Sequence, residues 1–264
     1  MRPGTAATAP RIALPTAVPN AIAIASGKGG VGKTWLAVTL SHALAQFGGK
    51  VLLFDADLGL ANVDIQLGLM PKRDLMGVMD GTVSLAEART PYRPGGFDVI
   101  AGQSGSGNLS SVPTRRLAEL NGDFHELARH YNRILFDMGA GLDRTVRQMA
   151  LQASTILVVA TDEPTSLTDA YAFVKTINAV KPGADMRFVI NMAATPRDGE
   201  RTYQTLLKAC QTFLDRSPPL AGTIRRDPKV REAIRLQTSL LSHAPGAPAA
   251  LDVVAMARLL LTAS

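Results

Sequence analysis

Short apolar runs alternate along this chain with longer segments whose apolar residues recur every three or four positions. The apolar runs predict strands, and the periodic segments predict helices. We expect strands at residues 20–26, 50–57, 97–103, 133–137, 155–161, 187–192 and 220–224. We expect helices at residues 35–46, 114–130, 166–180 and 200–214, followed by two more that close the chain. Residues 77–93 and 101–113 give the weakest pattern.

The predicted strands lack the alternation of apolar and polar residues that a half-exposed sheet would show. Residues 155–161, for example, read Thr-Ile-Leu-Val-Val-Ala-Thr. Such strands are buried on both faces, in mostly parallel sheets covered by helices on each side. We therefore predict an α/β fold with a doubly wound, mostly parallel sheet and helices on both faces. Residues 1–19, rich in Ala, Pro and Thr, predict a flexible leader, and residues 20–264 predict a single domain.

The loop between the first predicted strand and the first predicted helix carries the clearest chemistry. Residues 27–34 match G-x-x-x-x-G-K-[ST], the phosphate-binding P-loop. Backbone N–H groups of such a loop point at one anion, and the helix that follows adds its N-terminal dipole. We expect Lys33 to reach the β- and γ-phosphates of a nucleotide and the Thr34 hydroxyl to bind Mg²⁺. The predicted nucleotide-binding residues of the loop are Gly27, Lys28, Gly29, Gly30, Val31, Gly32, Lys33 and Thr34.

Three aspartates stand at the ends of two buried strands, where open α/β sheets bind their ligands. Buried carboxylates are costly unless they face a cation or a polar ligand. We expect Asp57 to orient the attacking water or to bind in the Mg²⁺ shell, and Asp55 to hold the loop or a metal-bound water. For both of these residues a helix N-cap is the alternative. Asp137, followed by Met-Gly-Ala-Gly, has the Walker B layout and is expected to hold Mg²⁺ through water.

Lys28 is the additional feature of the loop, because Lys33 already serves the phosphates within its own chain. A second ammonium group in so tight a loop needs an anionic partner. One interpretation is that Lys28 reaches the phosphates of a partner subunit, as an arginine finger does in trans. On that interpretation Lys28 acts with Lys33 and Asp57 as a catalytic residue. The alternative is a surface lysine outside the site.

Two later segments give weaker signals. Asn191 ends a predicted strand where a base could lie, and its amide suits the adenine edge, although a strand-end turn explains it equally well. Asp227 before Pro228 indicates a helix start whose backbone could line the base pocket. A local basic cluster suggests lipid headgroups, DNA or simply a solvated face as its surroundings. Its members are Arg225, Arg226, Lys229, Arg231 and Arg235.

The composition narrows the possible partners and sites. A formal net charge of +6 and a pI near 9.7 favour anionic lipid, nucleic acid or nucleotide as partners, with a solvated surface as the alternative. The single cysteine, Cys210, excludes an internal disulfide and a multi-cysteine iron–sulfur site within one chain. No apolar run is long enough to cross a bilayer, and no secretory signal is evident. These features indicate a cytoplasmic protein.

The sequence resembles the MinD/ParA ATPases, whose deviant Walker A motif corresponds to Lys-Gly-Gly-Val-Gly-Lys-Thr at residues 28–34. Within that family it is most similar to the flagellar-number regulators of the FlhG (FleN) branch. The matching strings are DADLGLANVDIQLGL at residues 55–69 and EPTSLTDAYAFVK at residues 163–175, with a further match at Asn-Met-Ala from residue 191. The resemblance extends over residues 21–235.

The resemblance implies a P-loop NTPase fold and a slow, partner-regulated ATPase that uses ATP and Mg²⁺. It implies that ATP drives a face-to-face homodimer, which hydrolysis releases. It also assigns roles to residues: Lys28 as signature lysine, Lys33 as P-loop lysine, Thr34 as Mg²⁺ ligand, Asp57 as switch I catalytic aspartate, Asp137 in switch II, Asn191 at adenine, and Glu163 and Asp169 at dimer or partner contacts.

By this resemblance, the expected function is an ATP-dependent switch that regulates flagellar number or placement. Its expected partners are a signal-recognition-type GTPase, switch-ring components or a transcription regulator, with the inner face of the cell membrane as a further contact. The alternative is a ParA/MinD-like positioning ATPase that binds DNA or membrane for cargo or division-site placement. A third interpretation is a non-hydrolysing scaffold, because Met138 stands where the family usually has Thr or Ser.

Overall fold

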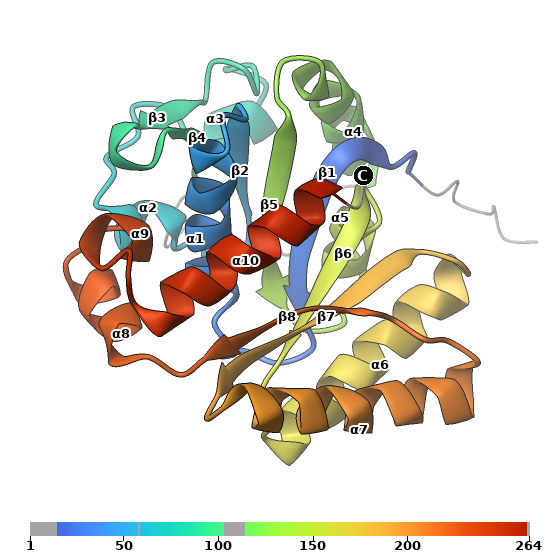
Figure 1. The fold of residues 1–264 in the computed structure, drawn as a ribbon. Coiled ribbons are helices and arrows are strands. Elements are labelled where there is room, and N and C mark those ends of the chain that lie inside the picture. Colours follow the sequence, from blue (N-terminus) through green and yellow to red (C-terminus); the bar gives the residue numbers. More distant parts are fainter. Residues whose placement is uncertain (1–14, 58, 103–113, 263–264) are drawn as a thin grey trace, which may run out of the picture.

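The computed structural model describes residues 15–57, 59–102 and 114–262, without the side chains of 114–118. An eight-stranded sheet with the order β3-β4-β2-β5-β1-β6-β7-β8 forms its centre (Figure 1). Neighbouring strands run parallel, except for β3 and β4, which are antiparallel. The strands are β1 Val18–Ser26, β2 Val51–Ala56, β3 Thr90–Tyr92, β4 Phe97–Ile100, β5 Arg133–Ala140, β6 Ala153–Ala160, β7 Asp185–Ala193 and β8 Leu220–Arg225.

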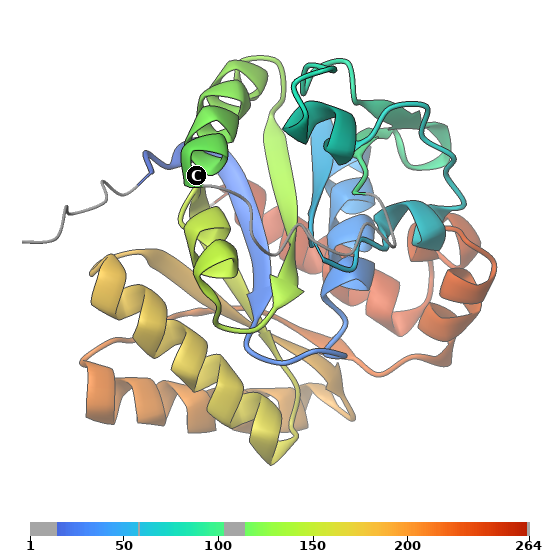
Figure 2. The same ribbon diagram turned by 180° about the vertical axis from the view of Figure 1, so that it is seen from behind.

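Helices cover both faces of this sheet. The layer with α1 and α10 is nearest in Figure 1, and the layer with α4, α5 and α6 is nearest in Figure 2. The helices are α1 Lys33–Gln46, α2 Val63–Leu67, α3 Leu75–Met79, the 3₁₀ helix η1 Arg93–Gly95, α4 Thr114–Ala128, α5 Arg144–Ala150, α6 Pro164–Val180, α7 Pro196–Leu214, α8 Pro228–Arg235, α9 Leu240–His243 and α10 Pro248–Thr262.

Each central strand contributes alternate side chains to two separate hydrophobic layers. In β1, Ala21, Ala23 and Ala25 join the cluster that includes the buried residues of α4, α5 and α6. Ile22 and Ile24 of the same strand join the cluster that includes α1 and α10. All five are buried, which explains why the strand reads as one apolar run rather than as an alternating pattern.

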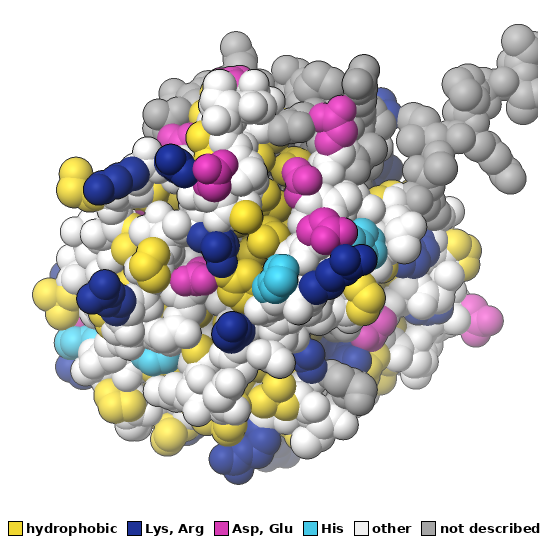
Figure 3. Space-filling view, turned by 90° about the horizontal axis from the view of Figure 1, so that it is seen from above, with side chains coloured by type: hydrophobic (Ala, Val, Ile, Leu, Met, Phe, Trp, Pro, Cys, Tyr) yellow, Lys and Arg dark blue, Asp and Glu magenta, His cyan; other side chains and the backbone are white. Residues whose placement is uncertain are grey.

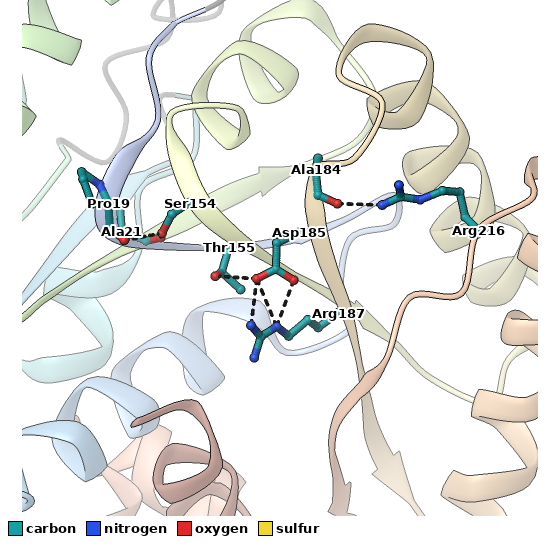
Figure 4. Close-up of polar contacts among 8 residues, drawn as sticks. All are labelled: Pro19, Ala21, Ser154, Thr155, Ala184, Asp185, Arg187 and Arg216. Atoms are coloured by element: carbon teal, nitrogen blue, oxygen red, sulfur yellow. Dashed lines mark hydrogen bonds and ion pairs between the residues drawn. The ribbon is translucent and has the colours of Figure 1, made fainter. Parts of the chain in front are cut away.

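Side-chain hydrogen bonds hold the amino ends of β1, β6 and β7 together (Figure 4). The register between β1 and β6 shifts between Val18 and Ile22, and the Ser154 hydroxyl donates to the carbonyls of Pro19 and Ala21 across that irregularity. Next to it, the Thr155 hydroxyl donates to Asp185, which also accepts from Arg187. These bonds pair backbone and charged groups where the regular ladder is interrupted.

The predicted fold class is confirmed: the sheet is mostly parallel and covered by helices on both faces. Each predicted strand and helix has a counterpart, with ends shifted by a few residues. The largest shift at a helix start is in α7, which begins at Pro196 instead of residue 200. The Thr195 hydroxyl accepts from the Asp198 N–H and Pro196 occupies the first turn, a capping signal that the apolar periodicity does not contain.

Some elements were missing from the sequence-based prediction. They are short, namely α2, α3, η1, α5, α9 and the edge strand β3, and too few residues form each one to show a period. With α9, three helices follow β8 where the sequence predicted two. A flexible leader was predicted for residues 1–19, and residues 1–14 of it lie outside the described residues. Its end was placed too late, since Val18 and Pro19 belong to β1. Of the weak region at 101–113, only residues 101 and 102 are described.

Candidate nucleotide-binding site

The P-loop connects β1 to α1 at the carboxyl edge of the sheet, and its glycines are required by geometry. Gly30 and Gly32 have positive φ angles of 80° and 93°, a region that other residues rarely adopt. A Cβ atom on Gly27 would collide with the backbone carbonyl of Asp169 in α6, and one on Gly32 would collide with the Asn191 amide. The loop therefore packs tightly between α6 and the end of β7.

Lys33 is the cation at the centre of this edge. Its side chain is nearly buried, with a residue exposure of 8%. Burial lowers the pKa of the Lys33 ammonium, while the negative charges of Asp137 and Asp57 raise it. A buried ammonium group is stable only beside compensating charge, and these two carboxylates supply it before any phosphate binds.

Asp137 sits on β5 and is almost completely buried. Burial raises the pKa of its carboxyl well above the usual range, and the charge of Asp55 raises it further. A hydrogen bond with the Thr34 side chain and the charge of Lys33 act in the opposite direction. Among the described atoms, Oδ1 of Asp137 has no hydrogen-bond partner. An orphaned carboxylate oxygen beside a threonine hydroxyl offers the hard oxygen donors that Mg²⁺ prefers, so these residues fit that ion.

Asp55 lies directly opposite Asp137 in the sheet register and is fully buried. Its carboxylate accepts backbone N–H groups of Asp57 at 3.1 Å, Asn62 at 3.0 Å and Val63 at 3.1 Å. Burial raises its pKa to about 7, although these hydrogen bonds act against the rise. Both carboxylate oxygens thus hold the loop between β2 and α2, including the start of α2.

Asp57 lies against Gly139, near the carboxyl end of β5. Its Oδ1 accepts from the Leu60 N–H at 3.1 Å, and a Cβ on Gly139 would lie 3.2 Å from the same oxygen. Gly139 therefore leaves the room that the Asp57 carboxylate occupies. This places Asp57, Asp137 and Lys33 together, as the sequence predicts for residues that act on one phosphate group.

Lys28 is bound within its own chain. Its ammonium donates to Glu163 Oε2 at 2.6 Å and to Thr165 Oγ1 at 2.8 Å, at the start of α6. The hydrogen bond from Lys28, and then its charge, lower the pKa of the exposed Glu163 carboxyl. In the sequence, Glu163 and Thr165 stand in a polar segment before a predicted helix. Their distance along the chain from Lys28 does not show that this segment contacts the P-loop.

Asn191 supports the P-loop rather than presenting a free amide. Its Nδ2 donates to the Val31 carbonyl at 2.8 Å and its Oδ1 accepts from the Met192 N–H at 2.9 Å. The residue is 3% exposed. Each end of the amide keeps one further hydrogen-bonding position, a second N–H and a second lone pair, so the adenine contact stays a prediction.

Asp227 caps α8, as the sequence indicates, and it also holds α10. One carboxylate oxygen accepts from the Lys229 N–H at 2.9 Å, and the other from the Ala249 N–H at 3.2 Å. The side chain is thereby committed to two helix starts. That the backbone at Asp227 lines the pocket of the nucleotide base stays a prediction.

The basic cluster near α8 is partly neutralised. Arg225 forms a bidentate contact with Asp252, with Nε–Oδ2 at 2.9 Å and Nη2–Oδ1 at 2.8 Å. Lys229 pairs with Glu232 at 2.7 Å. Because two of its five cations already have partners, the cluster offers less free charge to DNA or lipid than the sequence indicates. Within the described part of the chain, no helix combines the length and apolar character needed to cross a bilayer.

Comparison with known proteins identifies the family. Residues 22–240 match the CobQ/CobB/MinD/ParA nucleotide binding domain. The chain belongs to this family. It is 37% identical over 237 residues to the antiactivator FleN of Pseudomonas aeruginosa, covering 90% of this chain and 84% of FleN. It is 34% identical over 190 residues to the flagellum site-determining protein YlxH of Helicobacter pylori, covering 72% of this chain and 64% of YlxH.

Solved structures share the fold. The cell division ATPase MinD of Pyrococcus furiosus superimposes with a TM-score of 0.79 at 26% identity, over 93% of this chain and 99% of that one. MinD of Pyrococcus horikoshii, complexed with Mg-ADP, gives a TM-score of 0.77 at 25% identity, over 92% of this chain and 96% of that one. The chain is thus a P-loop ATPase that uses ATP and Mg²⁺, which confirms the predicted family, enzyme class and cofactors.

Proposed function

We propose that this chain is an ATP-dependent dimerisation switch that regulates the number or placement of flagella. The observation that carries the proposal is the complete P-loop and carboxylate site in a chain 37% identical to the antiactivator FleN along 90% of its length. The flagellum site-determining protein YlxH supports the same process. The proposed partners are flagellar proteins, namely a GTPase of the signal-recognition type, switch-ring components or a transcription regulator.

In the proposed reaction, backbone N–H groups of residues 29–34 hold the phosphates, and Lys33 neutralises the charge that develops on the transferred group. Asp57, positioned over Gly139, accepts a hydrogen bond from the attacking water and orients it. Thr34 and Asp137 would hold Mg²⁺, which supplies charge neutralisation at the phosphates when bound.

We further propose that Lys28 acts in trans. To reach the phosphates of a second subunit, its ammonium must leave Glu163 and Thr165. The ion pair is partly exposed, so water replaces the lost contacts at small cost. The same side chain thereby has an intrachain position without a partner subunit and an intersubunit position with one, and ATP selects the second.

Two variants separate binding from turnover in this proposal. Lys33→Ala removes the ammonium that contacts phosphate, so ATP should bind more weakly, and turnover and dimer formation should both fall. Asp57→Ala removes only the group that orients water, so ATP binding and the dimer should persist while turnover stops. Light scattering during size-exclusion chromatography and phosphate release measure both. Normal turnover in Asp57→Ala would contradict the assigned role.

The flagellar role is tested by deletion in cells that encode this chain, followed by flagella counts per cell. We expect a changed number or position, restored by the wild-type chain and not by Lys33→Ala. Lys208→Ala, an exposed substitution on α7, is the control that should restore the phenotype fully. Unchanged flagella after deletion would refute the flagellar role while leaving the ATPase assignment intact.

A further inference from the structure

A cavity opens at the amino edge of the sheet, on the side opposite the P-loop. It has a volume of about 510 Å³ and lies where β2, β4 and β5 begin. Figure 3 looks down on this edge and shows hydrophobic side chains at the bottom of a hollow, with basic, acidic and histidine side chains around it. A cavity of this volume falls within the range that binds small organic molecules.

The lining combines an apolar floor with a basic rim. Phe97 and Leu127 are buried apolar residues of the lining, and they come from the two different hydrophobic layers of the fold. Lys50, Arg89 and His130 are exposed on the rim. Among the described residues, neither the Lys50 ammonium nor the His130 ring has a hydrogen-bond or ion-pair partner, so both can serve a ligand.

The lining also contains an ordered polar group. The Tyr131 hydroxyl donates to the Asp98 carboxylate, and Arg89 donates to the same hydroxyl at 3.1 Å. Arg89 is fixed at a second point because its Nε donates to the Ala86 carbonyl at 2.6 Å. The Asp98 carboxylate therefore already accepts a hydrogen bond from Tyr131, and the nearby Arg89 guanidinium balances its negative charge. Lys50 then leaves the rim with one uncompensated positive charge.

We propose that this cavity binds a small phosphate monoester that carries an apolar ring or short chain. The phosphate would contact Lys50, Arg89 and His130, and the apolar part would lie over Phe97 and Leu127. The phosphate oxygens can accept from the Lys50 ammonium, the Arg89 guanidinium and the His130 ring, and their negative charge pairs with Lys50, whose charge Asp98 does not already balance. This inference is independent of the flagellar role, because none of the residues belongs to the nucleotide site.

The first test uses phenyl phosphate as the probe and the full nucleotide-free chain as the protein. The His130 ring resonances, assigned with a His130→Gln variant, report on the rim by NMR. We expect a saturable shift with a Kd on the order of 1 mM, as for a fragment of this size. Inorganic phosphate should bind at least severalfold more weakly, because it makes no apolar contact. Equal binding of both probes would overturn the apolar part of the proposal.

Variants then locate the site. Lys50→Gln should weaken binding by about tenfold because it removes a charged donor. Lys208→Gln makes the same charge change on exposed α7 and should leave the Kd unchanged. Ala86→Phe fills the rim without altering the backbone carbonyl that fixes Arg89, and it should abolish the shift.

Three results would overturn the proposal. The first is a His130 shift that fails to saturate by about 20 mM phenyl phosphate, which is far above the Kd expected for a fragment. The second is equal weakening in the Lys50→Gln and Lys208→Gln variants, which would indicate general screening. The third is full binding in Ala86→Phe. Thermal unfolding of each variant, compared with wild type, ensures that a lost shift reflects a filled or uncharged site in a folded protein.

Discussion

The two edges of one sheet handle charge in opposite ways. Near the carboxyl ends of β2 and β5, Asp55 and Asp137 lie opposite each other and are buried, and Asp137 faces Lys33. At the amino edge, Lys50 before β2 and Arg89 before β3 stand exposed around an open cavity. Buried charges must be compensated by specific partners, whereas exposed charges are already solvated. The buried carboxylates of the nucleotide edge therefore require a cation beside them, whereas the exposed cations of the amino edge are solvated around an open cavity.

Removing the buried cation should produce the largest effect. We expect Lys33→Ala to lower ATP turnover by about 10³-fold, because a preorganised charge at the transferred phosphate is lost. It also leaves Asp137 and Asp57 with less compensation. Phosphate release under saturating Mg²⁺ and ATP measures the loss. Lys50→Ala, the matched change at the exposed edge, should keep basal turnover within about twofold. Comparable losses in both variants would remove the distinction between the two edges.

Backbone fit is the next contribution to test. A methyl group at Gly27 would strike the Asp169 carbonyl, so Gly27→Ala must displace the P-loop from α6. We expect ATP affinity to fall by about 10²-fold, as misplacement of a binding loop by about 1 Å commonly causes. Gly122→Ala on α4 is the control, because a Cβ there meets no atom within 4 Å. Calorimetric titration with a non-hydrolysable ATP analogue compares the two. Unaltered affinity in Gly27→Ala would show that the loop does not bind in this conformation.

Asp55 tests how the carboxyl edge organises its loop. Asp55→Asn keeps the shape but turns one acceptor oxygen into a donor facing backbone N–H groups. We expect turnover to fall by about tenfold through misplacement of Asp57, with folding retained. A larger loss of kcat than of ATP affinity would identify a positioning role. Equal kcat in wild type and Asp55→Asn would contradict it.

The raised pKa of Asp55 also predicts that the free energy of unfolding of the protein without nucleotide or Mg²⁺ depends on pH. The folded pKa of Asp55 is raised from 3.8 to about 7. Its contribution to stability is therefore present at low pH and is lost as pH rises through that interval. Burial lowers the pKa of His42, whose contribution is lost in the other direction, as pH falls below 6.5. Comparing urea unfolding of wild type and Asp55→Asn cancels the His42 contribution. The wild type should lose more stability between pH 5 and pH 8.

Local sequence patterns were sufficient for the parts of the site that lie within one segment. The P-loop glycines, Lys33 and the strand-end aspartates follow from short motifs, because each motif is one strand, one turn and one helix start. The central strands were readable for a related reason, since burial on both faces leaves continuous apolar runs.

Contacts between distant segments could not be read in the same way. Lys28 and Glu163 are 135 positions apart, and Asn191 meets Val31 across 160 positions. No local period records such pairs, because the tertiary fold alone brings the segments together. The amino-edge cavity is a further case: its lining comes from four separate stretches, and each of them is unremarkable when read alone.

The smallest expected effect concerns the contact between Lys28 and Glu163. This ion pair is partly exposed, like the cations of the amino edge. Glu163→Gln removes the charge that Lys28 faces while retaining a side chain of the same length. Because exposed ion pairs contribute little, unfolding of the nucleotide-free chain should be almost unchanged. If Lys28 acts in trans, its release should become easier, and the concentration needed for the ATP-bound dimer should fall by about two- to threefold. Light scattering over a dilution series measures that shift, and Glu200→Gln on exposed α7 provides the matched control. A dimer that forms less readily in Glu163→Gln would mean that Glu163 itself belongs to the intersubunit contact, so that the carboxyl edge depends on an exposed charge as well as on buried ones.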